Sequence, residues 1–363
     1  MKFAHFAHVW GKPGYTPAQR YELLWRELET ADELGFDYGF CVEHHFRPDE
    51  SWMSAPSLYT VGAGARTKRI RLGGMGHIVP LHQPLRLAEE IAIADQMIGG
   101  RLEVGLVPGI VQDYFRPFKV EFENRRAVTL EYVQFLKAAF AGPPGQGFSF
   151  DGKYHHADNV KLAVKPAQQP HPPLWIETRD PATLVFCAEQ GISVGYFLLI
   201  PRDEAAAFYR TYYENWKKAG HAAKPRIAYS TLIYVDETDQ KALDKATSAV
   251  AQGYRGFFPT MRDDQLKDAQ AERAEVFRKR GEHSAAEIIL NILDPEYLMS
   301  RDLVFVGSPE TVTRKLKAAA AEGHFDTFFG EFNFGDLAGE DVLRSIRLFG
   351  THIIPALRDF EPF

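Results

Sequence analysis

The stretch Phe36-Asp37-Tyr38-Gly39-Phe40-Cys41-Val42-Glu43-His44-His45-Phe46 reads as a short apolar strand that runs straight into a carboxylate and two imidazoles. Parallel α/β proteins bind their ligands at the carboxyl ends of the strands, so this cluster predicts a site. Successive strand residues point to opposite faces, and at most one of His44 and His45 can therefore face the axis of a barrel. The alternative is a solvated loop that carries two histidines by chance.

Predicted strands and helices alternate along most of the chain. Apolar runs bounded by turn residues predict strands, and apolar residues at helical spacing predict helices. The predicted strands are Phe3–Val9, Phe36–Val42, Ile70–Leu72, Leu102–Val107, Leu174–Glu177, Ser193–Ile200, Arg226–Val235 and Phe325–Phe329. The predicted helices are Pro17–Leu34, Ala55–Arg66, Pro84–Ile98, Arg125–Phe140, Pro181–Gln190, Asp203–Ala219, Asp239–Tyr254, Pro309–Glu322 and Val342–Ile353. About eight such units predict an α/β fold, a (β/α)8 TIM barrel, with residues 1–363 as a single domain.

Two segments interrupt this alternation and are predicted to be insertions. Residues 142–173 are rich in Gly, Pro and His and carry a hairpin-like alternation at Phe148–Tyr154. Residues 256–300 include the highly charged run Met261–Arg280, which has few apolar anchors and is expected to be a mobile loop. A loop of this length inside a compact domain is usually functional or disordered.

Composition excludes several classes of protein. The chain has 45% hydrophobic and 25% charged residues, a net charge of −6 and no Lys/Arg run, so nucleic acid and anionic membranes are not expected partners. Cys41 and Cys187 lie in predicted apolar segments, which indicates reduced, buried thiols. No signal-peptide pattern and no apolar run of about 18 residues occurs, and we expect a cytoplasmic protein.

Common cofactor motifs are absent or out of context. The run Gly62-Ala63-Gly64-Ala65-Arg66-Thr67 lacks a third glycine and lies inside a predicted helix, so it is not a dinucleotide fingerprint. The histidine pairs at positions 5/8 and 44/45 diverge on their strands, and no metal site is predicted. A Gly-x-Ser-x-Gly elbow is also missing, which argues against a serine hydrolase.

Three turns that follow predicted strands would lie on the catalytic face of a barrel. They are Gly73–His77, Val107–Ile110 and Thr178–Pro181, and glycine in the first two lets a flat ligand approach the backbone closely. The third opens a helix with Asp180 as N-cap and Pro181 at the first helical position, and helix N-termini bind phosphate. Each turn could equally be an ordinary strand–helix connection.

Taken together, these residues resemble the bacterial luciferase-like, flavin-dependent monooxygenases. The resemblance spans nearly the whole chain and is carried by Glu43-His44-His45-Phe46, by the run from Thr67 to Phe118, which includes Asp95-Gln96-Met97 and Gly105-Leu106-Val107-Pro108-Gly109, and by Val306-Gly307-Ser308-Pro309. It implies a (β/α)8 barrel that binds reduced FMN, usually supplied by a separate flavin reductase. Relatives of this kind pair through outer helices, and a homodimer is expected, with the small residues of the helix Ala55–Arg66 at its interface.

The resemblance also assigns residues. His44 matches the catalytic histidine, and Glu43 is placed with the cofactor. Met75-Gly76 matches a non-proline cis peptide under the flavin ring, and Val107 and Ile110 match contacts to the ring edge. Pro108 stands where luciferase has an arginine near the flavin phosphate, and Asp180 stands where it has a serine. Thr183 matches a phosphate-contacting threonine, and Arg179 is expected to supply the positive charge. Apart from the resemblance, His45, Phe46, Trp10 and Tyr114 near the candidate pocket are assigned to an apolar substrate, although the aromatic residues could equally belong to the core.

The implied activity is a two-component FMN monooxygenase that oxidises a small organic substrate with O2 through a C4a-peroxyflavin, with His44 as general base or hydrogen-bond partner. An F420-dependent hydride-transfer oxidoreductase on the same fold is the second hypothesis. A flavin-binding protein without catalysis is the third, and a metal-dependent barrel hydrolase ranks last.

Overall fold

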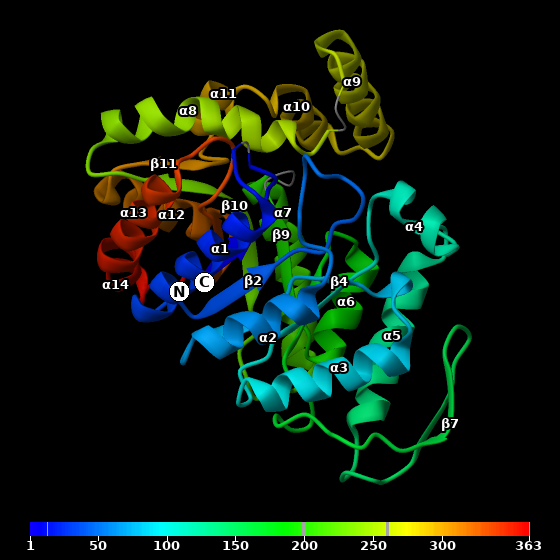
Figure 1. The fold of residues 1–363 in the computed structure, drawn as a ribbon. Coiled ribbons are helices and arrows are strands. Elements are labelled where there is room, and N and C mark those ends of the chain that lie inside the picture. Colours follow the sequence, from blue (N-terminus) through cyan, green and yellow to red (C-terminus); the bar gives the residue numbers. More distant parts are fainter. Residues whose placement is uncertain (13, 198–200, 259–260, 363) are drawn as a thin grey trace.

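The computed structural model describes residues 1–12, 14–197, 201–258 and 261–362, and within them eight parallel strands form a barrel (Figure 1). The strands follow one another around the barrel as β3 (Arg71–Gly74), β2 (Tyr38–Cys41), β1 (Lys2–Ala7), β12 (Thr327–Glu331), β10 (Ile227–Val235), β9 (Ser193–Phe197), β8 (Leu174–Glu177) and β5 (Val104–Val107). A bridge between Leu72 and Leu102 joins β3 to the start of β5 and closes the ring. The predicted TIM barrel is confirmed.

Helices cover the outside of the barrel, as the repeated strand–helix pattern predicts. They are α1 (Pro17–Glu33), α2 (Pro56–Arg66), α3 (Pro84–Met97), α5 (Arg125–Phe140), α6 (Pro181–Gln190), α7 (Arg202–Ala219), α8 (Asp239–Arg255), α12 (Pro309–Gly323) and α13 (Gly339–Leu348). Side-chain caps define several helix starts: Thr16 and Gln19 form a capping box at α1, and Asp180 caps α6. No helix among the described residues is long and apolar enough to cross a membrane.

The barrel closes where two glycine-bearing strands approach one another. A Cβ on Gly73 would lie 2.0 Å from the carbonyl oxygen of Glu103, and one on Gly105 would lie 2.5 Å from that of Gly74. Both contacts are with backbone, which cannot move aside as a side chain can. Glycine is therefore required on both sides of the seam between β3 and β5.

A layer of large apolar side chains fills the barrel interior. It includes Phe6, Phe40, Met75, Trp175 and Phe329, drawn from five places around the ring. Because strand side chains alternate, the inward positions one step further toward the carboxyl ends are His8, Glu177, Ser230 and Glu331. Ionisable groups thus lie directly above an apolar core layer.

The two insertions have different structures. The first contains a two-stranded antiparallel hairpin, β6 (Phe148–Asp151) with β7 (His156–Val160), as the alternation there predicts. The second is not a loop, and that expectation is wrong: it forms α9 (Asp263–Lys279), α10 (His283–Asn291) and α11 (Pro295–Ser300), and α9 extends from the top of the molecule in Figure 1. Leu266, Gln270 and Ala274 bury one stripe of α9 at four-residue spacing, a helical signal that the surrounding charges obscured.

Short elements escaped the sequence analysis. These are α4 (Gln112–Phe118), β4 (His77–Ile78), β11 (Phe305–Gly307) and α14 (Ile354–Leu357). The predicted strand Ser193–Ile200 is described only as far as Phe197, and positions 198–200 lie outside the described residues. Cys41 and Cys187 are buried free thiols, as predicted.

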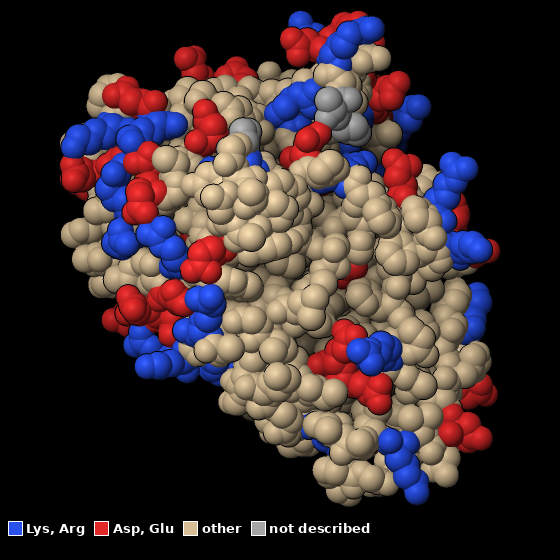
Figure 2. Space-filling model, viewed as in Figure 1, with Lys and Arg blue, Asp and Glu red and all other residues tan. Residues whose placement is uncertain are grey.

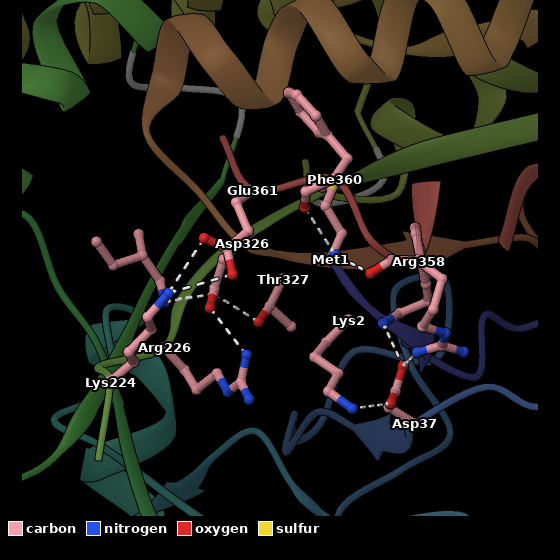
Figure 3. A network of polar contacts seen from close by, with 12 residues as sticks. Met1, Lys2, Asp37, Lys224, Arg226, Asp326, Thr327, Arg358, Phe360 and Glu361 are labelled. Carbon is pink, nitrogen blue, oxygen red and sulfur yellow. Dashed lines mark hydrogen bonds and ion pairs between the residues drawn. The ribbon is translucent and has the colours of Figure 1, made fainter. Parts of the chain in front are cut away.

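The amino end of the barrel is tied by ion pairs (Figure 3). Asp37 accepts from Lys2 Nζ at 2.7 Å and from the backbone of Phe3 at 2.9 Å, and it also pairs with Arg358 near the C-terminus. Asp326 pairs with Arg226 at 2.9 Å across β10 and β12. Residues at this end of a TIM barrel serve stability, so the search for a site turns to the opposite end.

Replacing Gly73 with Ala should destabilise the protein by about 3 kcal/mol or abolish soluble expression, because the new methyl group meets backbone. Gly195→Ala is the matched control. It is also a strand glycine, but its Cβ would lie 3.4 Å from the Ala228 side chain, and it should change the free energy of unfolding by no more than about 1 kcal/mol. Equal stability of both variants in urea unfolding would contradict the account of the seam.

Candidate active site

The carboxyl ends of β1, β2, β8 and β12 bring ionisable side chains together at one end of the barrel. His8 follows β1, and its Nδ1 lies 2.8 Å from Glu331 Oε2 at the end of β12. The indole of Trp10 also donates to Glu331, and its ring stacks on His8 at 4.6 Å. Burial opposes protonation of His8, but the adjacent Glu331 raises its pKa. The pair is a buried histidine–carboxylate contact at the carboxyl end of the barrel.

The backbone at Val9 allows both of these side chains to reach Glu331. Val9 is β-branched, buried and in the left-handed region, with φ of 57°. Strain of this kind costs on the order of 1–3 kcal/mol and clusters at functional sites. The loop after β1 is thus held in an unfavourable conformation that gathers His8 and Trp10 on one carboxylate.

His44 leaves the end of β2 and points at a second cluster. Its Nδ1 lies 3.0 Å from the Tyr114 hydroxyl on α4 and 3.2 Å from Glu50 Oε1. The Tyr114 hydroxyl donates to Glu50 Oε2 at 3.0 Å, and Arg47 lies 3.4 Å from the same oxygen. Burial, with the nearby charges of His8 and Arg47, holds the pKa of His44 well below its ordinary value. A neutral imidazole at this position can accept a proton.

Glu43 points the other way and joins the ends of β2 and β4. It lies 2.8 Å from His45 Nε2 and 2.9 Å from His82 Nε2, and it accepts from the Ile78 backbone at 3.1 Å. Burial opposes ionisation, but the hydrogen bonds from the two histidines lower the pKa of Glu43 to about 2. Glu43 is therefore an ionised structural anchor behind His44.

The same anchor brings together groups that could hold a metal ion. Ligand atoms of Glu43, His77 and His82 all lie within 4.8 Å of one another. The sequence spacing did not show this group, because the residues come from two separate segments. Hydrogen bonds already engage Glu43 and His82.

Glu177 ends β8 on the interior face, at the carboxyl end of the barrel. Burial raises its pKa to about 7, against the opposing effect of His8. A carboxyl that titrates near neutrality can donate or accept a proton in catalysis. Glu177 is predicted only as a strand residue, although its position as the last residue of that strand is a usable signal of a site.

The turns predicted to contact a flavin ring lie beside this mouth. The Met75–Gly76 peptide bond is cis, as the resemblance implies. Val107 and Pro108 are partly buried, and Ile110 is exposed at the tip of the next loop. Arg125 fixes that loop by donating to the Gly109 carbonyl at 3.1 Å.

The N-terminus of α6 carries the predicted phosphate residues, but two of them bind each other. Asp180 accepts from the Thr183 backbone at 2.9 Å and from its hydroxyl at 2.6 Å. Asp180 thus points inward as a cap, and the Thr183 hydroxyl is already engaged.

Positive charge gathers around this helix start. Arg179 lies 3.0 Å from Glu282, between α9 and α10, and stacks on Phe277 of α9. Arg126 lies 3.9 Å from Asp180. Burial, together with the charges of Arg280 and Arg126, lowers the pKa of Arg179 against the effect of Glu282. Only Arg179 of these three arginines was a sequence prediction, since Arg126 and Arg280 come from distant segments.

The residues assigned to substrate occupy different environments. Trp10 and Tyr114 are buried and bonded to Glu331 and Glu50, whereas Phe46 is 64% exposed and contacts Phe118. His45 packs between Tyr114 and Phe118 while bonded to Glu43. The structure therefore brings His44, Tyr114 and Trp10 to one region and leaves Phe46 at its rim.

Fold and site define a (β/α)8 barrel enzyme whose ionisable groups gather at the carboxyl ends of its strands. The chain belongs to the luciferase-like monooxygenase family, whose family model matches residues 1–327. Membership places the protein in a class of flavin-dependent monooxygenases.

Relatives and solved structures agree with this assignment. The chain is 31% identical to the Sinorhizobium fredii protein y4wF over 53% of this chain and 55% of that protein, and 25% identical to the alkanal monooxygenase alpha chain of Photobacterium leiognathi over 99% of each. The monooxygenase RslO1 from Streptomyces bottropensis superposes with a TM-score of 0.83 at 25% identity, over 98% and 99% of the two chains.

Two further structures share the fold and bind different cofactors. The oxygenating constituent of 3,6-diketocamphane monooxygenase from Pseudomonas putida, in complex with FMN, superposes with a TM-score of 0.78 at 21% identity over 98% of each chain. An F420-dependent secondary alcohol dehydrogenase superposes with a TM-score of 0.71 at 17% identity over 99% of each.

Replacing Glu177 with Gln should stabilise the protein above about pH 7 and have little effect below about pH 4.3. Because burial raises the pKa of Glu177 to about 7, the folded protein keeps a proton that the unfolded chain has lost, and wild-type stability falls as the pH rises from about 4.3 through about 7. Glutamine has no such proton. Melting temperatures of both proteins across this range measure the effect.

Glu189→Gln, on the exposed face of the following helix, is the matched control and should follow wild type at every pH. A melting-temperature difference for Glu177→Gln that does not vary with pH would mean that Glu177 is not desolvated in the folded protein.

Proposed function

We propose that the protein is a two-component monooxygenase that uses reduced FMN, supplied by a separate flavin reductase, and O2 to oxidise a small, apolar organic substrate. The observation that carries this proposal is the placement of His44, a partly buried imidazole with a lowered pKa, at the same end of the barrel as the arginine-flanked start of α6. One region thereby offers a proton acceptor and an anion site, both of which a phosphorylated flavin and its oxygen chemistry need.

The residues present fit FMN with a phosphate held by arginines. Asp180 and Thr183 are engaged with each other, so the cap itself does not supply the binding groups. Arg179 and Arg126 carry the charge instead, and the dipole of α6 favours an anion at the same point. Met75–Gly76, Val107 and Ile110 would lie against the ring. When bound, the reduced flavin supplies the electrons that activate O2.

Residues of the chain would then transfer protons and exclude water from the site. His44 would accept a proton at Nε2, since Nδ1 faces Tyr114 and Glu50. Glu177 can return or accept a second proton near neutral pH. Trp10 and Phe257, whose rings contact at 5.2 Å, form an apolar wall beside His8 that would exclude water from the site.

F420-dependent hydride transfer is the second candidate. The observation in its favour is the excess of positive charge, because Arg126, Arg179 and Arg280 together could hold a cofactor with a longer anionic tail. A non-catalytic flavin-binding role is disfavoured by the complete barrel and by the pairing of His44 with Glu50 and Tyr114.

Turnover with 18O2 distinguishes these functions. The wild-type protein, given reduced FMN and a panel of alkanals and cyclic ketones, should place one labelled oxygen atom in a product, detected by mass spectrometry. His44→Ala should lower that yield by about 10²–10⁴-fold. Hydride transfer from reduced F420 with no labelled product would overturn the proposal.

Replacing Arg179 with Ala should weaken binding of FMN about 10–100-fold and leave riboflavin, which has no phosphate, nearly unchanged. The variant removes the charge at the start of α6 without touching His44. Anaerobic fluorescence titration with both ligands measures the two affinities.

Arg26→Ala is a matched control, since that arginine is exposed and pairs with Glu340 between α1 and α13. It should bind both ligands as wild type does. An equal loss of FMN and riboflavin affinity in Arg179→Ala would show that Arg179 maintains structure through Glu282 rather than binding phosphate.

A homodimer through α2 and α3 is part of this proposal. Leu58 on α2 and Ile93 and Met97 on α3 are exposed apolar side chains. Figure 2 shows an uncharged area in the middle of the view, where α2 lies, with a group of acidic and basic side chains beside it, where α3 lies. Gly62, one of the small residues of α2, packs against its own chain: a Cβ on it would lie 3.2 Å from Trp25.

Replacing Leu58 and Met97 with Asp should convert the dimer into a folded monomer, because two charges on an apolar two-fold interface face like charges on the partner. Light scattering gives the mass and circular dichroism the fold. Wild-type protein that is monomeric at micromolar concentration would rule out this interface.

A further inference from the structure

Glu50 is a buried carboxylate with no role in the sequence-derived site. It lies in the loop after β2, is 2% exposed and contacts three polar side chains. Its Oε1 is 3.2 Å from His44 Nδ1, and its Oε2 is 3.0 Å from the Tyr114 hydroxyl and 3.4 Å from Arg47. Burying a carboxylate is costly unless it is paired, so its position needs an explanation.

The loop that carries Glu50 is rigidly attached to the barrel. The backbone amides of Glu50 and Ser51 both donate to the Arg47 carbonyl at 3.0 Å, which forms a tight turn. The Ser51 hydroxyl donates to the carbonyl of His8, and the Trp52 amide donates to that of Val9 at 2.9 Å. Glu50 is therefore fixed relative to both His8 and His44.

The hydrogen-bond directions determine which nitrogen of His44 carries the proton. The Tyr114 hydroxyl has one proton and donates it to Glu50 Oε2, so its oxygen faces His44 Nδ1 as an acceptor. Glu50 Oε1 is an acceptor as well. Nδ1 must then be the donor, because an unprotonated Nδ1 would place its lone pair against two oxygen lone pairs.

We propose that Glu50 is the positioning residue for His44: with the Tyr114 hydroxyl it holds the Nδ1–H tautomer and leaves Nε2 as the proton acceptor. The catalytic role of this contact rests on the proposed function. Its test does not, because the tautomer of His44 can be observed without any flavin. The arrangement is the one by which a carboxylate orients a catalytic imidazole and stabilises its protonated form in other enzymes.

The charges around His44 make that contribution necessary. His8 from β1, Arg47 in the same loop and His45 all disfavour a positive His44, and Arg273 of α9 acts on Arg47 and Glu50. Burial raises the pKa of Glu50, while Arg47 and Tyr114 favour its ionised form. Glu43 favours a positive His44, but its oxygens are bonded to His45 and His82. Glu50 is the carboxylate whose oxygen faces the ring directly.

Three variants separate the orienting role from the charge. Glu50→Gln keeps an acceptor oxygen but removes the charge, Glu50→Leu removes both, and Tyr114→Phe removes the second acceptor. Asp113→Asn is the matched control, since Asp113 is exposed and lies 4.0 Å from Arg47 without touching His44. Each is labelled with 15N-histidine and studied by 1H–15N correlation without any flavin, with His44→Gln to assign the resonance.

The wild-type spectrum should show His44 as the Nδ1–H tautomer. Glu50→Gln should keep that tautomer and lower the pH at which His44 titrates by about one unit, whereas Glu50→Leu should populate the Nε2–H form. Oxygenation should fall about tenfold in Glu50→Gln and more in Glu50→Leu, with reduced-FMN affinity unchanged.

A wild-type Nε2–H tautomer, or a titration and tautomer of His44 unchanged in both Glu50 variants while circular dichroism shows a native fold, would overturn the inference. A failure of the proposed function would look different: the tautomer would respond as predicted, but no labelled product would form with any flavin.

Discussion

The site depends on one buried carboxylate, Glu43, and on the three donors that keep it ionised. His45 and His82 and the Ile78 amide surround its oxygens at 2.8 to 3.1 Å. These bonds join the end of β2 to the short strand β4 and to the segment before α3. Glu43 and His44 follow the end of β2 and face different partners, so fixing Glu43 also constrains the direction of His44. Removing one partner of such a buried pair costs on the order of 3–5 kcal/mol, so the arrangement is held firmly.

At the carboxyl end of the barrel around Glu43, neighbouring ionisable groups differ in their pKa values. His8 is paired with Glu331, which raises its pKa, the pKa of His44 is held well below its ordinary value, and that of Glu177 is raised to about 7. The three groups sit above the same apolar layer of Phe6, Trp175 and Phe329, which excludes water from beneath them. Because this apolar layer lowers the local dielectric constant, each electrostatic interaction above it is stronger. Small differences in the charged neighbours of a group therefore produce large differences in its pKa.

Sequence periodicity was sufficient for the barrel but not for the partners of the site residues. The strand ends at Glu43-His44 and at Glu177 could be read from apolar runs that stop at polar residues. The pairing of His44 with Glu50 and Tyr114 could not, because it joins a turn, a strand end and a helix separated by up to 70 residues. At Met261–Arg280 the high charge predicted a mobile loop, but the segment forms α9. Its buried stripe lies among exposed acidic and basic residues, which obscured the helical spacing. The predicted phosphate site at the start of α6 is a second example. Asp180 was predicted as the helix N-cap, and the structure confirms it. The arginines around it come from distant segments, so the sequence pattern could not bring them together.

The central claim is that this barrel mouth binds reduced FMN in preference to F420, with the phosphate at the start of α6. Anaerobic calorimetric titration of the wild-type protein with reduced FMN, reduced F420 and reduced riboflavin tests it most directly. The account predicts one site per chain, tightest for reduced FMN and weaker for riboflavin by about tenfold or more, the contribution of one charge-assisted phosphate contact. Saturable binding of reduced F420 with no measurable binding of reduced FMN would contradict it.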